Sequence, residues 1–218
     1  MTLYDIAAIL GYSIGIAAVV GLVSWKRTDP AYHPFIIVTT LAFINHITSL
    51  QMVRWFGANT VNANIFVFVE SIIYVWQFQR WKLLKRSAML FPMIMLGLAI
   101  IWVLDNLIVH RLTTLNSFFR IISSFLLVLL SIEQLNKLIW FSRKNLFVNS
   151  CFLICCGLLI YFSYKATIEV FFFIELKASI AFYTSIFAIL IYLNFFVNLI
   201  FIWATVWIPR KQKFMSLP

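Results

Sequence analysis

The sequence predicts an all-α integral membrane protein, a polytopic bundle of seven transmembrane helices with its N-terminus outside and its C-terminus in the cytoplasm. Three observations lead to this prediction. The 218 residues are 63% hydrophobic and only 11% charged, whereas about a quarter of the residues of a soluble protein are charged. The apolar residues form seven long segments, and about 20 apolar residues cross a bilayer as a helix. Basic residues are concentrated in alternate connections between these segments.

Each apolar segment is expected to form one membrane span, and the seven spans make a single domain over residues 1–218. The first segment has an acidic residue before it and basic residues after it, the reverse of a secretory signal, so it is expected to be retained. Pro92 is the only proline inside a segment, so interrupted helices of the kind found in many transporters are not expected. The expected spans are residues 4–24, 34–53, 62–79, 88–109, 116–136, 146–168 and 179–207.

The basic residues set the orientation, because positive charge near span ends is retained on the cytoplasmic side. Twelve of the 17 Lys and Arg residues follow the first, third, fifth and seventh spans, and the intervening connections hold only Arg54, Arg111 and Lys177. The net charge of +10 is thus spread over four membrane-flanking segments. A nucleic-acid partner is therefore not expected, and membrane lipid is the expected partner. The twelve residues are Lys26, Arg27, Arg80, Lys82, Lys85, Arg86, Lys137, Arg143, Lys144, Arg210, Lys211 and Lys213.

Ionisable residues inside the spans are the candidates for function, because each costs about 2.5 to 3.5 kcal/mol in lipid unless it has a partner or a wet cavity. Glu70 is expected about 13 Å and Arg120 about 10 Å below the outer ends of their spans, so the two side chains could meet. Lys165 is expected near the outer boundary, with Glu169 one turn further on the same face. A snorkelling lysine paired with this glutamate is the simple interpretation. His46 is expected near the midplane.

Helical periodicity extends these positions into polar faces. Tyr74 shares a face with Glu70, Tyr161 shares a face with Lys165, and Asp105 approaches the outer end of the fourth span. Five helices thus offer polar groups to the outer half of the bundle, which predicts an outward-opening polar pocket. A closed structural network, in which these groups only satisfy one another, is the alternative. The expected ligand-binding residues are Glu70, Arg120, Lys165, His46, Tyr74, Tyr161, Asp105 and Glu169.

No residue pattern in the sequence indicates a metal, a cofactor or a catalytic centre. His33, His46 and His110 are expected at three different depths, so a three-histidine zinc site is not predicted. Cys151 and Cys155 share a helix face, but no further ligand is expected at their depth. Neither a glycine-rich phosphate loop nor a nucleophile elbow occurs. We therefore expect no metal site and no cofactor, and we assign no catalytic residue.

Five segments of the sequence carry a resemblance to a known family, namely YDIAAILGYSIG, YVWQFQRW, NSFFRIIS, IYFSYKATIEVF and IYLNFFVNLIFIWATVWIPRKQKF. They resemble segments of small seven-helix membrane proteins of Bacteroidota, and the resemblance covers nearly the whole chain. The resemblance implies a bacterial inner membrane. The family has no established activity, so no catalytic residue can be carried over from it.

These observations favour a non-enzymatic sensor or regulatory subunit that binds a small molecule or a lipid in the outward-facing pocket. Its cytoplasmic segments are too short for an output domain, so a cytoplasmic signalling partner is expected. The loop from Arg80 to Arg86 and the tail from Arg210 are candidate docking surfaces, or bind anionic lipid. An intramembrane lipid-modifying enzyme that uses Glu70 and His46 as acid and base is the alternative. A small-solute transporter is the third hypothesis.

Overall fold

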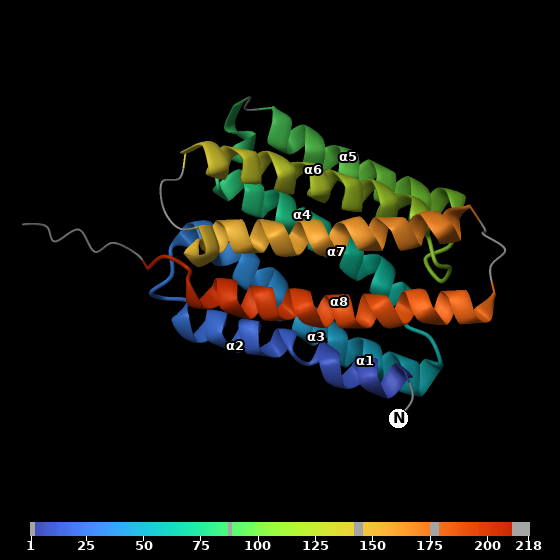
Figure 1. The fold of residues 1–218 in the computed structure, drawn as a ribbon. Helices are drawn as coiled ribbons and strands as arrows, with labels where there is room; N and C mark the ends of the chain where they lie inside the picture. Colours follow the sequence, from blue (N-terminus) through green and yellow to red (C-terminus); the bar gives the residue numbers. More distant parts are fainter. Residues whose placement is uncertain (1–2, 87–88, 142–145, 175–178, 211–218) are drawn as a thin grey trace, which may run out of the picture.

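A computed structural model describes residues 3–86, 89–141, 146–174 and 179–210. Over these residues the chain is helical, and its only extended pairing is an isolated bridge between Thr28 and Arg210. Seven of the helices are long and apolar enough to cross a membrane (Figure 1). The predicted fold class is confirmed at this level, as an all-α bundle of seven such helices. Five of the basic residues used to predict orientation lie outside the described residues, namely Arg143, Lys144, Lys177, Lys211 and Lys213.

Each predicted span overlaps one long helix, except that the first overlaps two helices in tandem. Short 3-10 turns occupy three of the connections, and a π-helical segment extends the fourth span. The elements in chain order are α1 (Leu3–Gly11), α2 (Ile14–Ser24), η1 (Pro30–Tyr32), α3 (His33–Phe56), α4 (Thr60–Arg80), η2 (Leu83–Arg86), α5 (Leu90–Val103), η3 (Leu104–Val109), α6 (Ser117–Phe141), η4 (Leu146–Val148), α7 (Ser150–Phe173) and α8 (Ile180–Val206).

Side chains and glycine define several helix ends. The first amides of a helix have no carbonyl partner within the helix, so a side-chain oxygen at the N-cap stabilises the end. Asp29 accepts a 2.8 Å hydrogen bond from the backbone N–H two residues later at the start of η1. Asn149 caps α7 and Ser179 caps α8 in the same way. Helix α3 ends at Gly57, whose φ of +73° is the left-handed conformation that glycine adopts most readily.

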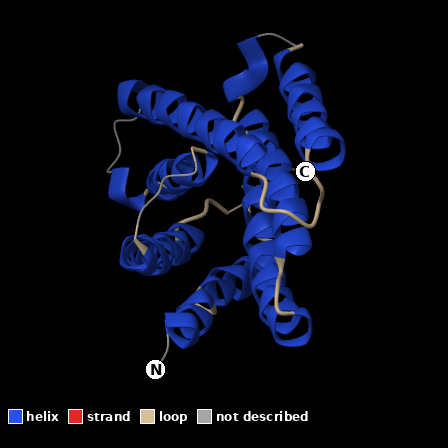
Figure 2. Cartoon of the chain, turned by 90° about the vertical axis from the view of Figure 1, so that its right-hand side faces the viewer, coloured by secondary structure: helices blue, strands red, loops and turns tan. Residues whose placement is uncertain are grey.

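Helix α7 packs against both α6 and α8, and α3 packs against both α2 and α4. Figure 2 shows that the described part of the chain consists of helices joined by loops. Glycines allow close helix contacts, of which those at Gly21 and Gly157 are examples. A Cβ atom on Gly21 would lie 2.9 Å from Ile36, and one on Gly157 would lie 2.5 Å from the ring of Phe201. Neither neighbour could keep its place if these glycines carried side chains. Such contacts between small and large residues are typical of helix packing in membranes.

Large apolar side chains cover the outer faces of the bundle. Val23 is 83% exposed, Trp140 is 85% exposed and Ile180 is 87% exposed. Apolar surface on this scale would be unfavourable in water, but it matches the hydrocarbon that surrounds a transmembrane helix. The surface of the described residues is therefore that of a multi-pass membrane protein, as the composition predicts.

The expectation of uninterrupted helices is wrong at one place, although this place contains no proline. The first span is interrupted at Tyr12 and Ser13, between α1 and α2. There the amides of these two residues bond to carbonyls three residues earlier, at Ile9 and Leu10, instead of four residues earlier. The carbonyl of Ala8 consequently has no bond from the amide of Tyr12. In the fourth span, the π-helix η3 widens the last turn, a geometry that is rare and is often found at functional sites.

Candidate functional site

A cavity lies between α1, α3, α4, α6, α7 and α8, and it is divided into three neighbouring compartments. We call them the terminal compartment, of ≈ 280 Å³, the deep compartment, of ≈ 170 Å³, and the lateral compartment, of ≈ 310 Å³. Ser49 and Tyr161 line all three, so the compartments form one continuous region of the bundle. The terminal compartment is lined by Tyr4, Val53 and Asn59, which lie at the end of the bundle that carries the N-terminus (Figure 1).

Seven of the eight residues expected to bind a ligand line this cavity. His46 and Tyr161 line the terminal compartment, and both continue into the deep compartment. The deep compartment adds Glu70 and Tyr74. The lateral compartment is lined by Arg120, Lys165 and Glu169, together with Tyr161. The structure thus brings together polar side chains from α3, α4, α6 and α7.

The four charged residues of the cavity form two buried ion pairs. Lys165 Nζ lies 3.3 Å from Glu70 Oε2, joining α7 to α4, and these side chains are 12% and 8% exposed. Arg120 Nη1 lies 3.2 Å from Glu169 Oε1, joining α6 to α7. The expected pairs, Glu70 with Arg120 and Lys165 with Glu169, are therefore not the ones that form. The expected pairs are compatible with the depth of these residues in the membrane. In the structure, however, Glu70 of α4 pairs with a base on α7, and Glu169 of α7 pairs with a base on α6.

The Arg120 pair is part of a wider polar network that the sequence did not reveal. Arg120 Nη2 donates to Asn64 Oδ1 at 2.8 Å, and the Asn64 amide donates to the backbone carbonyls of Leu112 and Thr114. Ser117 donates a 2.7 Å hydrogen bond to the second oxygen of Glu169. A buried asparagine within an apolar span was the available signal, because an amide in lipid needs a partner. This network ties the connection before α6 to α4 and α7.

Asp105 does not join the cavity and lines none of the three compartments. Its carboxylate accepts a 2.8 Å hydrogen bond from the backbone N–H of Phe119, in the first turn of α6. The other oxygen lies 3.0 Å from Nδ1 of His110. A carboxylate that accepts from a helix N-terminus is favoured by the helix dipole as well as by the hydrogen bond. Asp105 therefore holds the π-helix η3 against α6, which is a structural task.

His46 links the cavity to the interruption in the first span. Its Nε2 lies 3.0 Å from the carbonyl oxygen of Ala8, the group that the interruption leaves without its usual amide. Because a carbonyl only accepts, Nε2 must carry the proton, and Nδ1 of a neutral ring is left as an acceptor. The ring is packed against Gly11 so closely that a Cβ atom there would lie 2.1 Å from its Cε1. Tyr12 covers its edge at 5.0 Å between ring centres.

Aromatic rings and amides complete the wall. Lys165 Nζ lies 5.3 Å from the centres of both the Tyr161 and Phe162 rings, a distance at which a cation–π attraction stabilises the ammonium group. Asn62 donates to Asn45 Oδ1 at 2.7 Å and to Ser49 Oγ at 2.9 Å. The two N–H groups of Asn45 make no hydrogen bond to a described residue. The cavity therefore combines two neutralised ion pairs with uncharged donors and acceptors that have capacity to spare.

Toward the opposite end of the bundle, the cavity stops at a tightly packed layer. The deep compartment ends at Phe201, whose ring packs edge to face on Phe35 at 5.3 Å. Phe35 and Phe78 are completely buried. The side chain of Gln77 lies beyond them, where its carbonyl accepts from the N–H of Phe35 and its amide donates to the carbonyl of Ala31. The cavity thus has one closed end.

The described residues do not contain three His, Cys, Asp or Glu side chains grouped so that they could hold a metal ion. Cys151 and Cys155 are buried in the core, and Cys151 Sγ accepts a 3.4 Å hydrogen bond from Gln134. The thiols therefore act as small apolar side chains. The chemistry that the cavity offers is hydrogen bonding and charge, from Glu70 and Lys165 in particular.

Comparisons with known proteins do not assign a family or a function to the chain. No family model matches the chain, and neither the curated proteins nor the solved structures include a significant match. The function must accordingly be argued from the geometry of the cavity.

Proposed function

We propose that this multi-pass membrane protein is a sensor or regulatory subunit that binds a small polar molecule in the cavity between α1, α3, α4, α6, α7 and α8. The observation that carries the proposal is a cavity closed at one end, into which separate helices bring polar side chains. Ionisable residues in membrane spans typically mark binding sites or pathways. The terminal compartment, of ≈ 280 Å³, is slightly smaller than most ligand pockets, which measure about 300 to 1,000 Å³. A small ligand fits best.

Binding is favoured over catalysis because both carboxylates of the cavity are held in ion pairs. A general acid or base needs a carboxyl group that can exchange a proton with the substrate. Glu70 lines the same compartment as His46, but it is paired with Lys165 at 3.3 Å, and Glu169 is paired with Arg120. Each carboxylate would have to leave its buried partner before it could reach a substrate, and breaking a buried ion pair is costly. The pairs suit recognition of a polar ligand better than proton transfer.

The proposed orientation places the N-terminus outside and the terminal compartment at the outer surface, in a bacterial inner membrane. Its support is the distribution of basic residues, since Lys26, Arg27, Arg80, Lys82 and Lys85 all lie at the end of the bundle opposite the N-terminus. Positive charge is retained on the cytoplasmic side. A signal from the cavity then needs a cytoplasmic partner, which binds at the loop that includes η2.

Transport is the second candidate, and the interruption of the first span favours it. Transporters commonly bind their substrates where a transmembrane helix is interrupted. Here Gly11 and Ile14, on either side of the interruption, line the deep compartment. Transport would require the layer formed by Phe35 and Phe201 to open, so the two candidates differ in whether the cavity becomes accessible from the other side.

Thiol labelling tests the cavity, the orientation and transport together. Ser49→Cys, in a Cys156→Ala background, introduces a thiol that lines all three compartments, while Cys151 and Cys155 are buried. Lys26→Cys is the matched exposed thiol at the opposite end. In intact cells a membrane-impermeant maleimide should label Ser49→Cys, and it should reach Lys26→Cys only after permeabilisation.

Failure of Ser49→Cys to react from either side would overturn the open cavity, and labelling of Lys26→Cys in intact cells would invert the orientation. Labelling of Ser49→Cys from both sides would favour transport.

Ligand capture tests binding directly. The protein is purified in mild detergent, and the small molecules that it releases on denaturation are identified by mass spectrometry. The comparison is with the double variant Glu70→Gln/Lys165→Met, which removes both charges together, and with Lys85→Met as the exposed control. A compound that is enriched in the wild type and the control, and lost from the double variant, supports the proposal. Identical profiles for all three proteins would argue for a closed structural network.

A further inference from the structure

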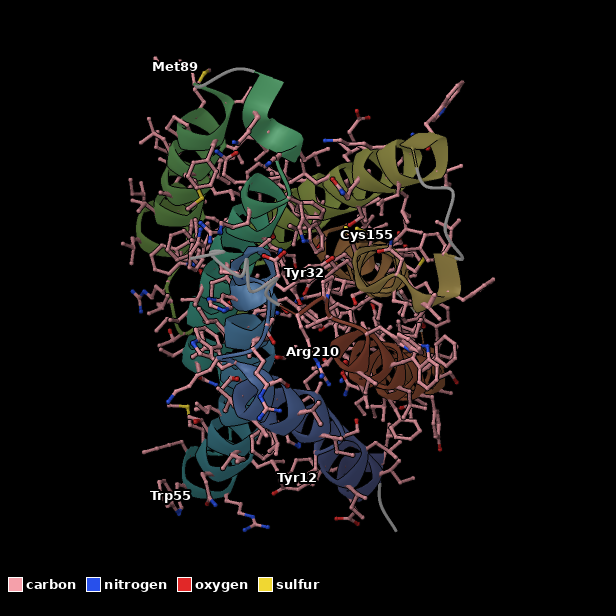
Figure 3. The ribbon with its side chains drawn as sticks, turned by 90° about the vertical axis from the view of Figure 1, so that its left-hand side faces the viewer. Tyr12, Tyr32, Trp55, Met89, Cys155 and Arg210 are labelled. Carbon is pink, nitrogen blue, oxygen red and sulfur yellow. The ribbon has the colours of Figure 1, made fainter. Side chains whose placement is uncertain are left out.

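A second hollow lies on the surface of the bundle and shares no lining residue with the cavity. This α2–α3 groove has a volume of ≈ 740 Å³ and is lined by the end of α2, the residues that follow it, and the second and third turns of α3. It lies at the end of the bundle opposite the N-terminus, the end that faces the viewer in Figure 3. Its lining residues are Leu22, Val23, Trp25, Lys26, Arg27, Ile37, Thr40 and Leu41.

The groove follows from how α2 and α3 meet. On their inner side the two helices touch at Gly21 and Ile36, where a Cβ atom on the glycine would lie 2.9 Å from the isoleucine. Both residues are buried. On the outer side, Leu22 and Val23 point away from this contact and are 51% and 83% exposed. The helices therefore make contact along the inside and leave an apolar furrow along the outside.

The groove is apolar along its length and positively charged at one end. Lys26 and Arg27 are exposed and follow the end of α2. Neither forms an ion pair with a carboxylate in the described part of the chain. Trp25 forms the end wall, stacked on His33 at 4.0 Å between ring centres. An indole beside basic residues at the end of a span is typical of the interface between hydrocarbon and headgroups.

We propose that the α2–α3 groove is a binding site for an anionic phospholipid. The headgroup phosphate lies against Lys26 and Arg27, and an acyl chain follows the apolar furrow past Val23 and Leu41. The groove complements such a lipid in two ways. Its basic end matches the negative charge of the headgroup, and its apolar furrow matches the acyl chain that leads into the bilayer. A basic site of this kind attracts anionic lipid by about 1 kcal/mol for each Lys or Arg near the membrane surface. The site is independent of the proposed ligand cavity.

Native mass spectrometry of the purified, delipidated protein tests this site with phosphatidylglycerol and phosphatidylcholine as probes. The wild type should retain phosphatidylglycerol and not phosphatidylcholine. Lys26→Gln/Arg27→Gln should weaken phosphatidylglycerol binding about 30-fold, the combined contribution of two basic residues. The matched control is Lys82→Gln/Lys85→Gln, which removes two exposed charges at the same end without touching the groove. Equal weakening by both double variants would reduce the effect to general surface charge and overturn the site.

The acyl chain is tested separately from the headgroup. Val23→Trp should occlude the furrow and weaken phosphatidylglycerol binding, whereas Val19→Trp should not, because Val19 is exposed on the same span but does not line the groove. Both positions are on the surface, so neither variant disturbs the core. Inorganic phosphate at the same concentration should not compete with the lipid. Competition by phosphate, or equal binding by the two tryptophan variants, would show that the furrow holds no chain.

Discussion

The Lys165 and Glu70 pair should show strong energetic coupling, because each charge is buried and depends on the other. At the observed Nζ to Oε2 distance of 3.3 Å, and with an effective dielectric constant of about 20, the attraction is about 5 kcal/mol. Part of this attraction only offsets the cost of removing both charges from water. Lys165→Met or Glu70→Gln alone leaves one buried charge unpaired and should lower the free energy of unfolding by about 3 to 5 kcal/mol. The double variant should be close to the wild type.

The measurement is a double-mutant cycle in which unfolding by sodium dodecyl sulfate is followed from mixed micelles by circular dichroism. Lys85→Met is the control, because Lys85 is exposed and an exposed charge contributes little to stability. We expect the two single variants to be less stable than the double variant. If the effects of the single variants add in the double variant, or if Lys165→Met unfolds like the control, then the two side chains do not depend on each other and the description of the pair is wrong.

Two further predictions concern packing and the fourth span. Gly11→Ala should destabilise the protein by about 1 to 3 kcal/mol, as overpacking does, because the new Cβ would lie 2.1 Å from the ring of His46. Gly97→Ala is the control and should be tolerated, because its Cβ would meet nothing within 4 Å. Equal unfolding midpoints for the two alanine variants would contradict this contact. Asp105→Ala should cost about 1 to 3 kcal/mol by leaving the N–H of Phe119 unpaired, and it should not change what the cavity retains. Loss of a retained ligand in this variant would show that Asp105 belongs to the site after all.

Composition and segment length were sufficient to predict the number of spans. An apolar run of about 20 residues has few alternatives to a transmembrane helix, since in lipid the backbone must satisfy its own hydrogen bonds. The interruption at Tyr12 and Ser13 was not predicted, because its causes lie in other helices. His46 binds the carbonyl of Ala8, and Asn198 donates to Ser13 Oγ at 2.9 Å. A proline would have made the interruption of the helix predictable from the sequence, whereas these contacts exist only in the folded bundle.

The sequence also predicted that polar residues converge, but not which ones pair. Position along a helix gives depth to within a few ångströms, and depth placed Glu70 and Arg120 at similar levels. Pairing depends as well on how each helix is rotated and on which helices are neighbours, and the sequence of one chain constrains neither. Asp105 illustrates the same limit, because its depth was compatible with the cavity while its rotation directs it to the N–H of Phe119.

The cavity and the interrupted span are one structural feature. Tyr12 and Ser13 bond only to carbonyls three residues earlier, and such bonds have poorer geometry than those of a regular α-helix. The missing bond is replaced by His46, and the turn is held by Asn198; both residues line the deep compartment. A polar group placed in this compartment therefore competes for the same donors that hold the interruption. The segment of the first span with irregular backbone hydrogen bonds is thus the one that the contents of the cavity are best placed to influence.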